Sequence, residues 1–108
     1  MVTIAKYTSI YEKSIAKLIN ADERYDLEQS IMDAPKAHPV IPGTGGIRKA
    51  RFASHNKGKR GGSRLCYYYL EINYTVYFLK AYAKNEQIDL SPTDKKRLSA
   101  LVIAIKAS

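Results

Sequence analysis

At 108 residues, of which 45% are hydrophobic and 26% charged, the chain has the size and composition of one globular domain, residues 1–108. Its only cysteine, Cys66, excludes an internal disulfide. No apolar run forms a leader or reaches the ~20 residues of a membrane helix. Together these features predict a soluble cytoplasmic protein without a membrane partner. The net charge of +8 favours a polyanionic partner, nucleic acid first.

The N-terminal third predicts a short strand followed by a helical hairpin. The strand covers residues 3–6. The first helix begins at Ser9, which forms a capping-box pattern with Glu12. The second helix takes Asp22 as its N-cap and ends before Pro35, and apolar residues recur at helical spacing in both helices.

The rest of the chain predicts a loop, a small sheet and a final helix. Residues 35–46 contain three prolines and three glycines, which is typical of a loop. A Gly-rich loop joins the first two strands, and the last helix begins at the N-cap Ser91. The predicted strands are Ile47 to Ser54, Arg64 to Asn73 and Val76 to Lys84. The layout predicts an α+β fold with helices packed on one face of an antiparallel sheet.

The positive charge is concentrated in one stretch. Residues 47–64 carry seven basic and no acidic residues, whereas residues 1–46 carry five basic and six acidic ones and residues 65–108 six and four. The stretch can be a solvated loop that only keeps the protein in solution, but solubilising surfaces usually mix both signs. The concentration therefore favours a nucleic-acid-binding surface.

Strand alternation sorts the basic residues onto one face of the predicted sheet. The opposite face is apolar, includes Leu79, and is expected under the helices. Tyr68 and Tyr82 share the basic face and can offer rings to unpaired bases, although tyrosines in strands more often pack against neighbours. The cations on the basic face are Lys49, Arg51, Arg64, Lys80 and Lys84, with Lys57, Lys59 and Arg60 in the adjoining loop.

No metal or cofactor site is indicated by the residue pattern. His38 and His55 lie in predicted loops without ligand spacing, and the GTGG run lacks the lysine of a phosphate-binding loop. RNA permits chemistry by lysine and arginine alone, because its 2′-hydroxyl is a built-in nucleophile. Such residues orient that hydroxyl, accept its proton and stabilise the charged phosphorane.

The runs GTGGIRKARFASHNKGKRGGSRLCYYYL and VYFLKAYAKNEQIDLS closely resemble the RelE/HigB toxins of bacterial type II toxin–antitoxin systems, their HigB-like branch in particular. The similarity is dense over about residues 40–102. It implies a RelE-like fold: an antiparallel-dominated sheet, two N-terminal helices on one face and a C-terminal helix. It also implies a metal-independent mRNA interferase, an endoribonuclease that cuts mRNA in the ribosomal A site by 2′-hydroxyl attack and so inhibits translation. The implied partners are the 70S ribosome, its mRNA and a helix-turn-helix antitoxin encoded next to it, with no cofactor.

The resemblance implies a role for individual residues. Lys49 and Arg51 match basic positions for proton transfer and phosphate contact. Arg64 matches the arginine that stabilises the transition state, and Lys84 matches a basic position at the end of the last strand. The residues assigned to RNA binding are Arg48, Lys57, Lys59, Arg60, Lys80, Tyr82, Asn85 and Glu86.

The sequence departs from some relatives, which carry a catalytic tyrosine or histidine near the chain end. Here that region reads Asp89-Leu90-Ser91-Pro92. The general base therefore stays open, with Lys49 preferred over Glu86, and Lys84 favoured as a phosphate ligand.

Two other functions suit the same fold. One is a ParE-like inhibitor of DNA gyrase, and the other is an RNA- or antitoxin-binding protein without catalysis. The dense set of cations in residues 47–64 favours the nuclease over the gyrase inhibitor.

Overall fold

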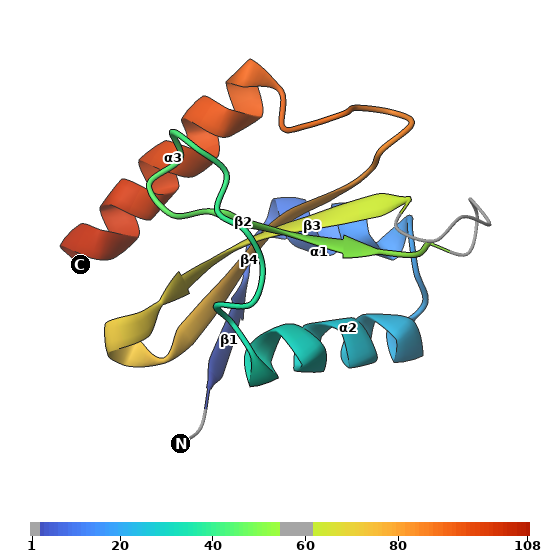
Figure 1. Cartoon of the computed structure of the whole chain (residues 1–108), viewed down its shortest axis with the longest axis horizontal. Coiled ribbons are helices and arrows are strands. Elements are labelled where there is room, and N and C mark those ends of the chain that lie inside the picture. The colour runs from blue at the N-terminus through green and yellow to red at the C-terminus, as the bar shows by residue number, and fades with distance from the viewer. Residues whose placement is uncertain (1–2, 55–61) are drawn as a thin grey trace.

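The computed structural model describes residues 3–54 and 62–108, and Figure 1 shows helices on both sides of a central sheet. The elements confirm the predicted α+β class and its chain order. Within the described ranges, no helix combines the length and the apolarity that crossing a membrane requires. The elements are β1 (Ile4–Tyr7), α1 (Ser9–Ala16), α2 (Ala21–Asp33), β2 (Arg48–Phe52), β3 (Ser63–Leu70), a short 3-10 helix (Glu71–Asn73), β4 (Thr75–Ala83) and α3 (Pro92–Ala107).

The sheet has the strand order β1-β4-β3-β2, with β1 parallel to β4 and the other pairs antiparallel. The β3–β4 hairpin forms its centre, because the connection through Glu71–Asn73 is short and sequential strands tend to pair. At the edge, β2 pairs with β3 so that Lys49 lies opposite Cys66 and Arg51 lies opposite Arg64. This register sets the positions of the basic side chains.

The helices begin at side-chain caps, two of which lie earlier than predicted. Thr8 caps α1 in place of Ser9, and Asn20 caps α2 in place of Asp22. In both cases the cap has an extended backbone and its side-chain oxygen accepts an N–H of the first turn. Neighbouring residues of cap-forming type made the two positions hard to distinguish by pattern. Ser91 caps α3 as predicted.

One face of the sheet is covered by the two N-terminal helices. Tyr11 and Ile15 of α1 and Ile31 of α2 are fully buried there, against strand residues that include Leu65 and Phe78. For β2 and β3 the apolar positions at this face are those that alternation predicted, since Ala50 and Phe52 of β2 and Leu65 and Tyr67 of β3 all belong to this core.

The other face carries a second core under α3. Leu98, Val102 and Ile105 of this helix pack with Cys66 and Tyr68 of β3. The prediction that the helices share one face is therefore wrong for α3, which lies across the sheet from α1 and α2 (Figure 1). Burial of each of the three helix side chains contributes about 1.5–3 kcal/mol, which favours covering this face over leaving it open.

A β-bulge adds to the second core. The β3–β4 register shifts between Cys66 and Tyr67, which leaves Leu79 as an extra residue of β4. Leu79 is fully buried in the core under α3, instead of the opposite face where strict alternation predicted it.

A buried charge network joins the two N-terminal helices. Glu28 accepts hydrogen bonds from the Tyr11 hydroxyl at 2.6 Å and from Arg24 Nε at 2.7 Å. Arg24 also pairs with Glu12 and lies over the rings of Tyr7 and Tyr11. Burial, then the contact with Glu28, raises the pKa of the Tyr11 hydroxyl, so it remains a donor. The network holds the helical hairpin on the face away from α3.

Two lysines hold α3 on the sheet. Lys80 of β4 pairs with Asp94 in the first turn of the helix. Lys106, near the other end, donates to the Gly45 carbonyl at 2.8 Å and lies over the Tyr68 ring. The helix is thus attached at both ends.

We expect the Lys80–Asp94 pair to contribute to a loss of stability in acid. Burial acts to raise the pKa of Asp94, but the hydrogen bond and charge of Lys80 lower it below its ordinary 3.8. A carboxyl group whose pKa is lower in the folded state than in the unfolded state stabilises the fold at pH values above its unfolded-state pKa. That stabilisation is lost as the pH falls through the pKa of the folded state. Urea unfolding of the wild type and of Asp94→Asn should differ by a constant amount above about pH 5 and by less below about pH 4. A difference that is the same at all these pH values would contradict the assignment.

Candidate functional site

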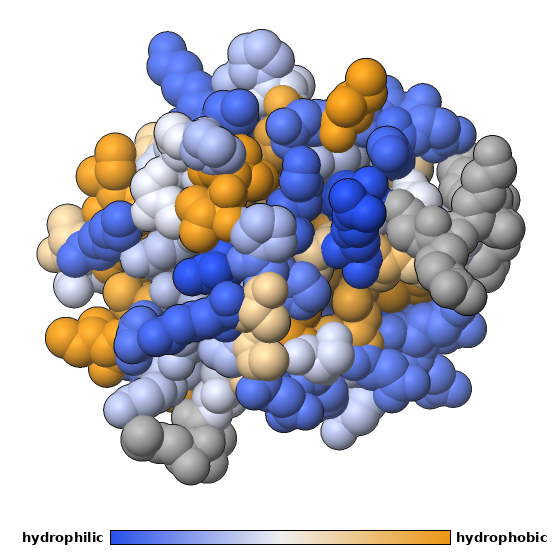
Figure 2. Space-filling model, viewed as in Figure 1, coloured by the Kyte–Doolittle hydropathy of each residue, from blue (hydrophilic) through white to orange (hydrophobic). Residues whose placement is uncertain are grey.

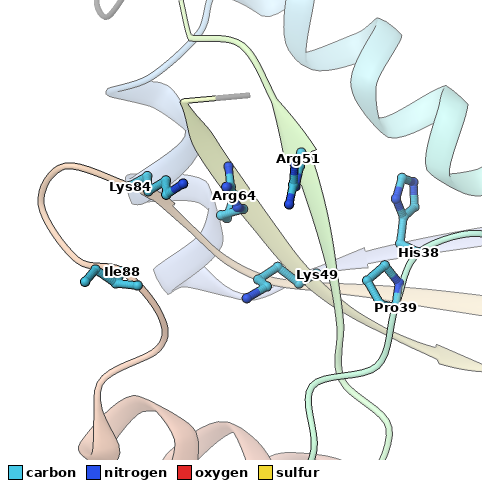
Figure 3. A pocket seen from close by; sticks show the side chains of 7 residues that line it. All are labelled: His38, Pro39, Lys49, Arg51, Arg64, Lys84 and Ile88. Atoms are coloured by element: carbon cyan, nitrogen blue, oxygen red, sulfur yellow. The ribbon is translucent and has the colours of Figure 1, made fainter. Parts of the chain in front are cut away.

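A hollow of about 510 Å³ opens on the α3 side of the sheet, beside β2 and β3. We call it the cationic hollow, since four of the described residues that line it are lysine or arginine. Figure 3 shows their side chains between the segment after β4 and the loop before β2. Figure 2 shows strongly hydrophilic side chains gathered on the same part of the surface. The lining residues are His38, Pro39, Lys49, Arg51, Arg64, Lys84 and Ile88.

The strand register brings the predicted catalytic cations together. Lys49 and Arg51 are two residues apart on β2 and share a face, and Arg51 lies directly opposite Arg64 on β3. Lys84 follows the last residue of β4, and its N–H donates to the Gly62 carbonyl at 2.8 Å, next to the start of β3. Like charges directly opposite each other destabilise a sheet. A bound anion would remove that cost.

Arg64 is the most enclosed of the four cations. Only 5% of the residue is exposed, and its Nη1 donates to the Ser63 carbonyl at 3.0 Å. Arg51 and Lys84 are exposed, and Lys49 is half-buried. The guanidinium of Arg64 is therefore held in place before any ligand arrives, whereas the exposed side chains of Arg51 and Lys84 can adjust.

His38 lines the cationic hollow, although its sequence position indicated only a loop. Arg48 Nη1 donates to the His38 carbonyl at 2.7 Å, and the Lys49 N–H donates to the Pro39 carbonyl at 3.0 Å. The ring edge of His38 also meets Tyr67, with 6.1 Å between ring centroids and an interplanar angle of 89°. These contacts fold the loop back along the outer edge of β2. No local pattern signals that return, so strand periodicity missed this residue.

Two predicted RNA-binding cations lie outside the lining. Arg48 shares the parity of Ala50, on the face away from the hollow, and its guanidinium holds the carbonyls of Lys36 and His38. Lys80 is paired with Asp94 of α3. Arg48 thus holds the loop before β2, and Lys80 holds α3. Their assignment to RNA binding stays a prediction.

The tyrosines predicted for base stacking are core residues. Tyr68 is 8% and Tyr82 5% exposed, and both rings pack in the core under α3. Burial raises the pKa of both hydroxyls. The prediction of open rings is wrong, because α3 covers the part of the face that was expected to be free.

The remaining predicted residues lie elsewhere. Asn85 and Glu86 are exposed in the turn after β4. Glu86 lines a second hollow of about 240 Å³ together with Ser14 and Lys17, rather than the cationic hollow. The predicted loop residues Lys57, Lys59 and Arg60, together with His55, lie outside the described residues.

Comparison with known proteins identifies the fold. No family model matches the sequence. The chain is similar to a doubly substituted mutant of the Escherichia coli toxin RelE in the free state, with a TM-score of 0.58, 17% identity, and 82% of this chain and 90% of that one covered. A chain of the intact E. coli RelBE toxin–antitoxin complex has a TM-score of 0.56 and 15% identity, with 76% of this chain and 96% of that one covered. The isolated E. coli RelE toxin has a TM-score of 0.52 and 12% identity, with 93% of this chain and 99% of that one covered. The chain therefore has the RelE-like toxin fold, as the sequence resemblance implied.

Proposed function

We propose that this protein is the toxin of a bacterial type II toxin–antitoxin system, of the HigB-like branch, and acts in the cytoplasm as a ribosome-dependent mRNA interferase. The observation that carries the proposal is the cationic hollow, where Arg51 and Arg64 are directly opposed on paired strands with Lys49 and Lys84 beside them. A phosphodiester is the ligand that such a set suits, because guanidinium forms paired hydrogen bonds with phosphate oxygens. The RelE-like fold supports the same function.

The proposed reaction is attack of the RNA 2′-hydroxyl on the adjacent phosphorus. The O2′–P bond forms, the P–O5′ bond breaks, and the products are a 2′,3′-cyclic phosphate and a 5′-hydroxyl. Arg64 donates from a fixed position to the non-bridging oxygens, whose negative charge grows in the transition state. Arg51 and Lys84, which are exposed, bind the incoming phosphate.

Proton transfer is assigned to His38 and Lys49. Among the described residues that line the hollow, imidazole is the side-chain type that ordinarily exchanges a proton near neutrality. His38 therefore takes the 2′-hydroxyl proton, and the Lys49 ammonium gives one to the leaving 5′-oxygen. His38 thereby replaces Lys49 as the preferred general base. Glu86, which lines the second hollow, takes no part in the proposed reaction.

The ribosome and an antitoxin complete the proposal. One imidazole and one ammonium give modest acid–base catalysis, so we expect the ribosome to supply the in-line alignment of the mRNA. An antitoxin encoded next to the toxin would hold it inactive. The RelBE complex, which contains a toxin and an antitoxin, supports a partner of this kind.

Expression in bacteria with mapping of mRNA 5′ ends tests the function. We expect growth arrest and new 5′ ends inside translated reading frames. The matched control is the same mRNA with its start codon removed, which should stay intact. Equal cleavage of that control, or of naked mRNA by the purified protein, would contradict ribosome dependence. Growth arrest without cleavage, together with inhibition of DNA supercoiling by gyrase, would favour the ParE-like function.

A further inference from the structure

We infer that Asp89 is a positioning residue, whose carboxylate orients the Lys49 ammonium at the edge of the cationic hollow. The inference rests on the proposed function, because it concerns the group that protonates the leaving oxygen. Asp89 lies in the segment between β4 and α3, forty residues along the chain from Lys49. The two meet only through the fold, which brings that segment against β2.

The carboxylate itself is held in place. Its Oδ1 accepts the Leu90 N–H at 2.9 Å and the Tyr82 hydroxyl at 3.5 Å, and lies 3.7 Å from Lys49 Nζ. The Asp89 carbonyl in turn accepts from Gln87 Nε2 at 2.9 Å. Because the backbone and the buried Tyr82 both hold this oxygen, Asp89 can fix the direction in which the flexible lysine side chain points.

Stability alone accounts poorly for this pair. The side chain of Asp89 is 43% exposed and that of Lys49 is 29% exposed, and ion pairs in such surroundings add little to stability. Lys80–Asp94 offers a comparison on the same side of the sheet, more enclosed at 20% and 16%. It fastens α3 outside the hollow, whereas Lys49–Asp89 lies at the hollow's rim. We therefore assign the Lys49–Asp89 pair to the site and the Lys80–Asp94 pair to the fold.

A double-mutant cycle in ribosome-dependent cleavage tests the inference. Asp89→Asn should lower kcat by about 10- to 100-fold with little change in KM, because a misdirected catalytic group costs rate more than binding. In a Lys49→Met background the same change should have no further effect, since Asp89 acts through Lys49. Asp89→Glu should restore part of the rate. The matched control Asp94→Asn should keep the wild-type kcat below its unfolding temperature.

Three kinetic outcomes would overturn the inference. The first is an unchanged kcat in Asp89→Asn, and the second is an equal loss of kcat on Asp89→Asn in the wild-type and Lys49→Met backgrounds. The third is faster cleavage by Asp89→Asn, which would make Asp89 a counter-ion that competes with phosphate. Side-chain NMR of Lys49 separates this from failure of the proposed function. Its Cε signal should differ between the wild type and Asp89→Asn at one fixed pH, because the substitution removes the charge beside the ammonium. If the difference is present but the wild type cuts no RNA, the ion pair stands and the proposed function is wrong; if the two signals are the same, the inference is wrong.

Discussion

Replacing Arg64 by alanine is expected to reduce mRNA cleavage by about a hundredfold or more, the usual loss when a fixed transition-state donor is removed. Arg64 is 5% exposed on β3 and opposed by Arg51 on β2, so its guanidinium is in position before substrate binds. Binding to ribosomes should persist, because Arg51 and Lys84 still contact phosphate. The measurements are single-turnover cleavage of ribosome-bound mRNA and co-sedimentation with ribosomes.

The substitution needs a fold control, since Arg64 is buried and donates to the Ser63 carbonyl. Arg64→Lys keeps the charge and most of the volume but loses the paired donors, so it should recover only part of the rate. Arg97→Ala, an exposed arginine of α3 outside the hollow, should cleave like the wild type. Full cleavage activity in a folded Arg64→Ala protein, checked by circular dichroism, would remove Arg64 from the site. Growth arrest by that variant without mRNA cleavage would reopen the gyrase-inhibitor function.

Replacing His38 by alanine is expected to lower the cleavage rate by about 100- to 10,000-fold, the range for loss of a general acid or base. His38 lines the hollow with its ring edge against Tyr67, and the loop stays anchored, because Arg48 bonds the backbone carbonyl of His38 and not its side chain. The variant should therefore fold and bind ribosomes. Adding free imidazole to His38→Ala should restore part of the rate, since a small base can enter the vacated space.

The imidazole experiment separates a proton acceptor from a structural ring. His38→Phe, which keeps a ring to pack against Tyr67, should be as inactive as His38→Ala and should not respond to imidazole. If His38→Phe is active, the ring acts only through packing. If His38→Ala is active without imidazole, the base is another group.

Local patterns in the sequence were enough to predict the three main strands and the two faces of β2. Lys49 and Arg51 alternate with Ala50 and Phe52, and the structure keeps the apolar pair in the core of the N-terminal helices. This succeeds because the pleat of a strand sends successive side chains to opposite faces whatever surrounds it. The start of α3 at Ser91 was equally readable, because a cap acts within one turn of its helix.

The surroundings of those side chains were decided only by the tertiary structure. The bulge at Leu79 and the packing of α3 closed part of the face expected to be open, which buried Tyr82 and gave Lys80 a carboxylate partner. The loop that carries His38 returns along β2, and the segment that carries Asp89 meets the same strand from the other side. Such meetings depend on pairing and packing between residues far apart in the chain. The residue types of this sequence therefore predicted a basic strand face, and only the fold decided which cations line a hollow and which acid and base stand beside them.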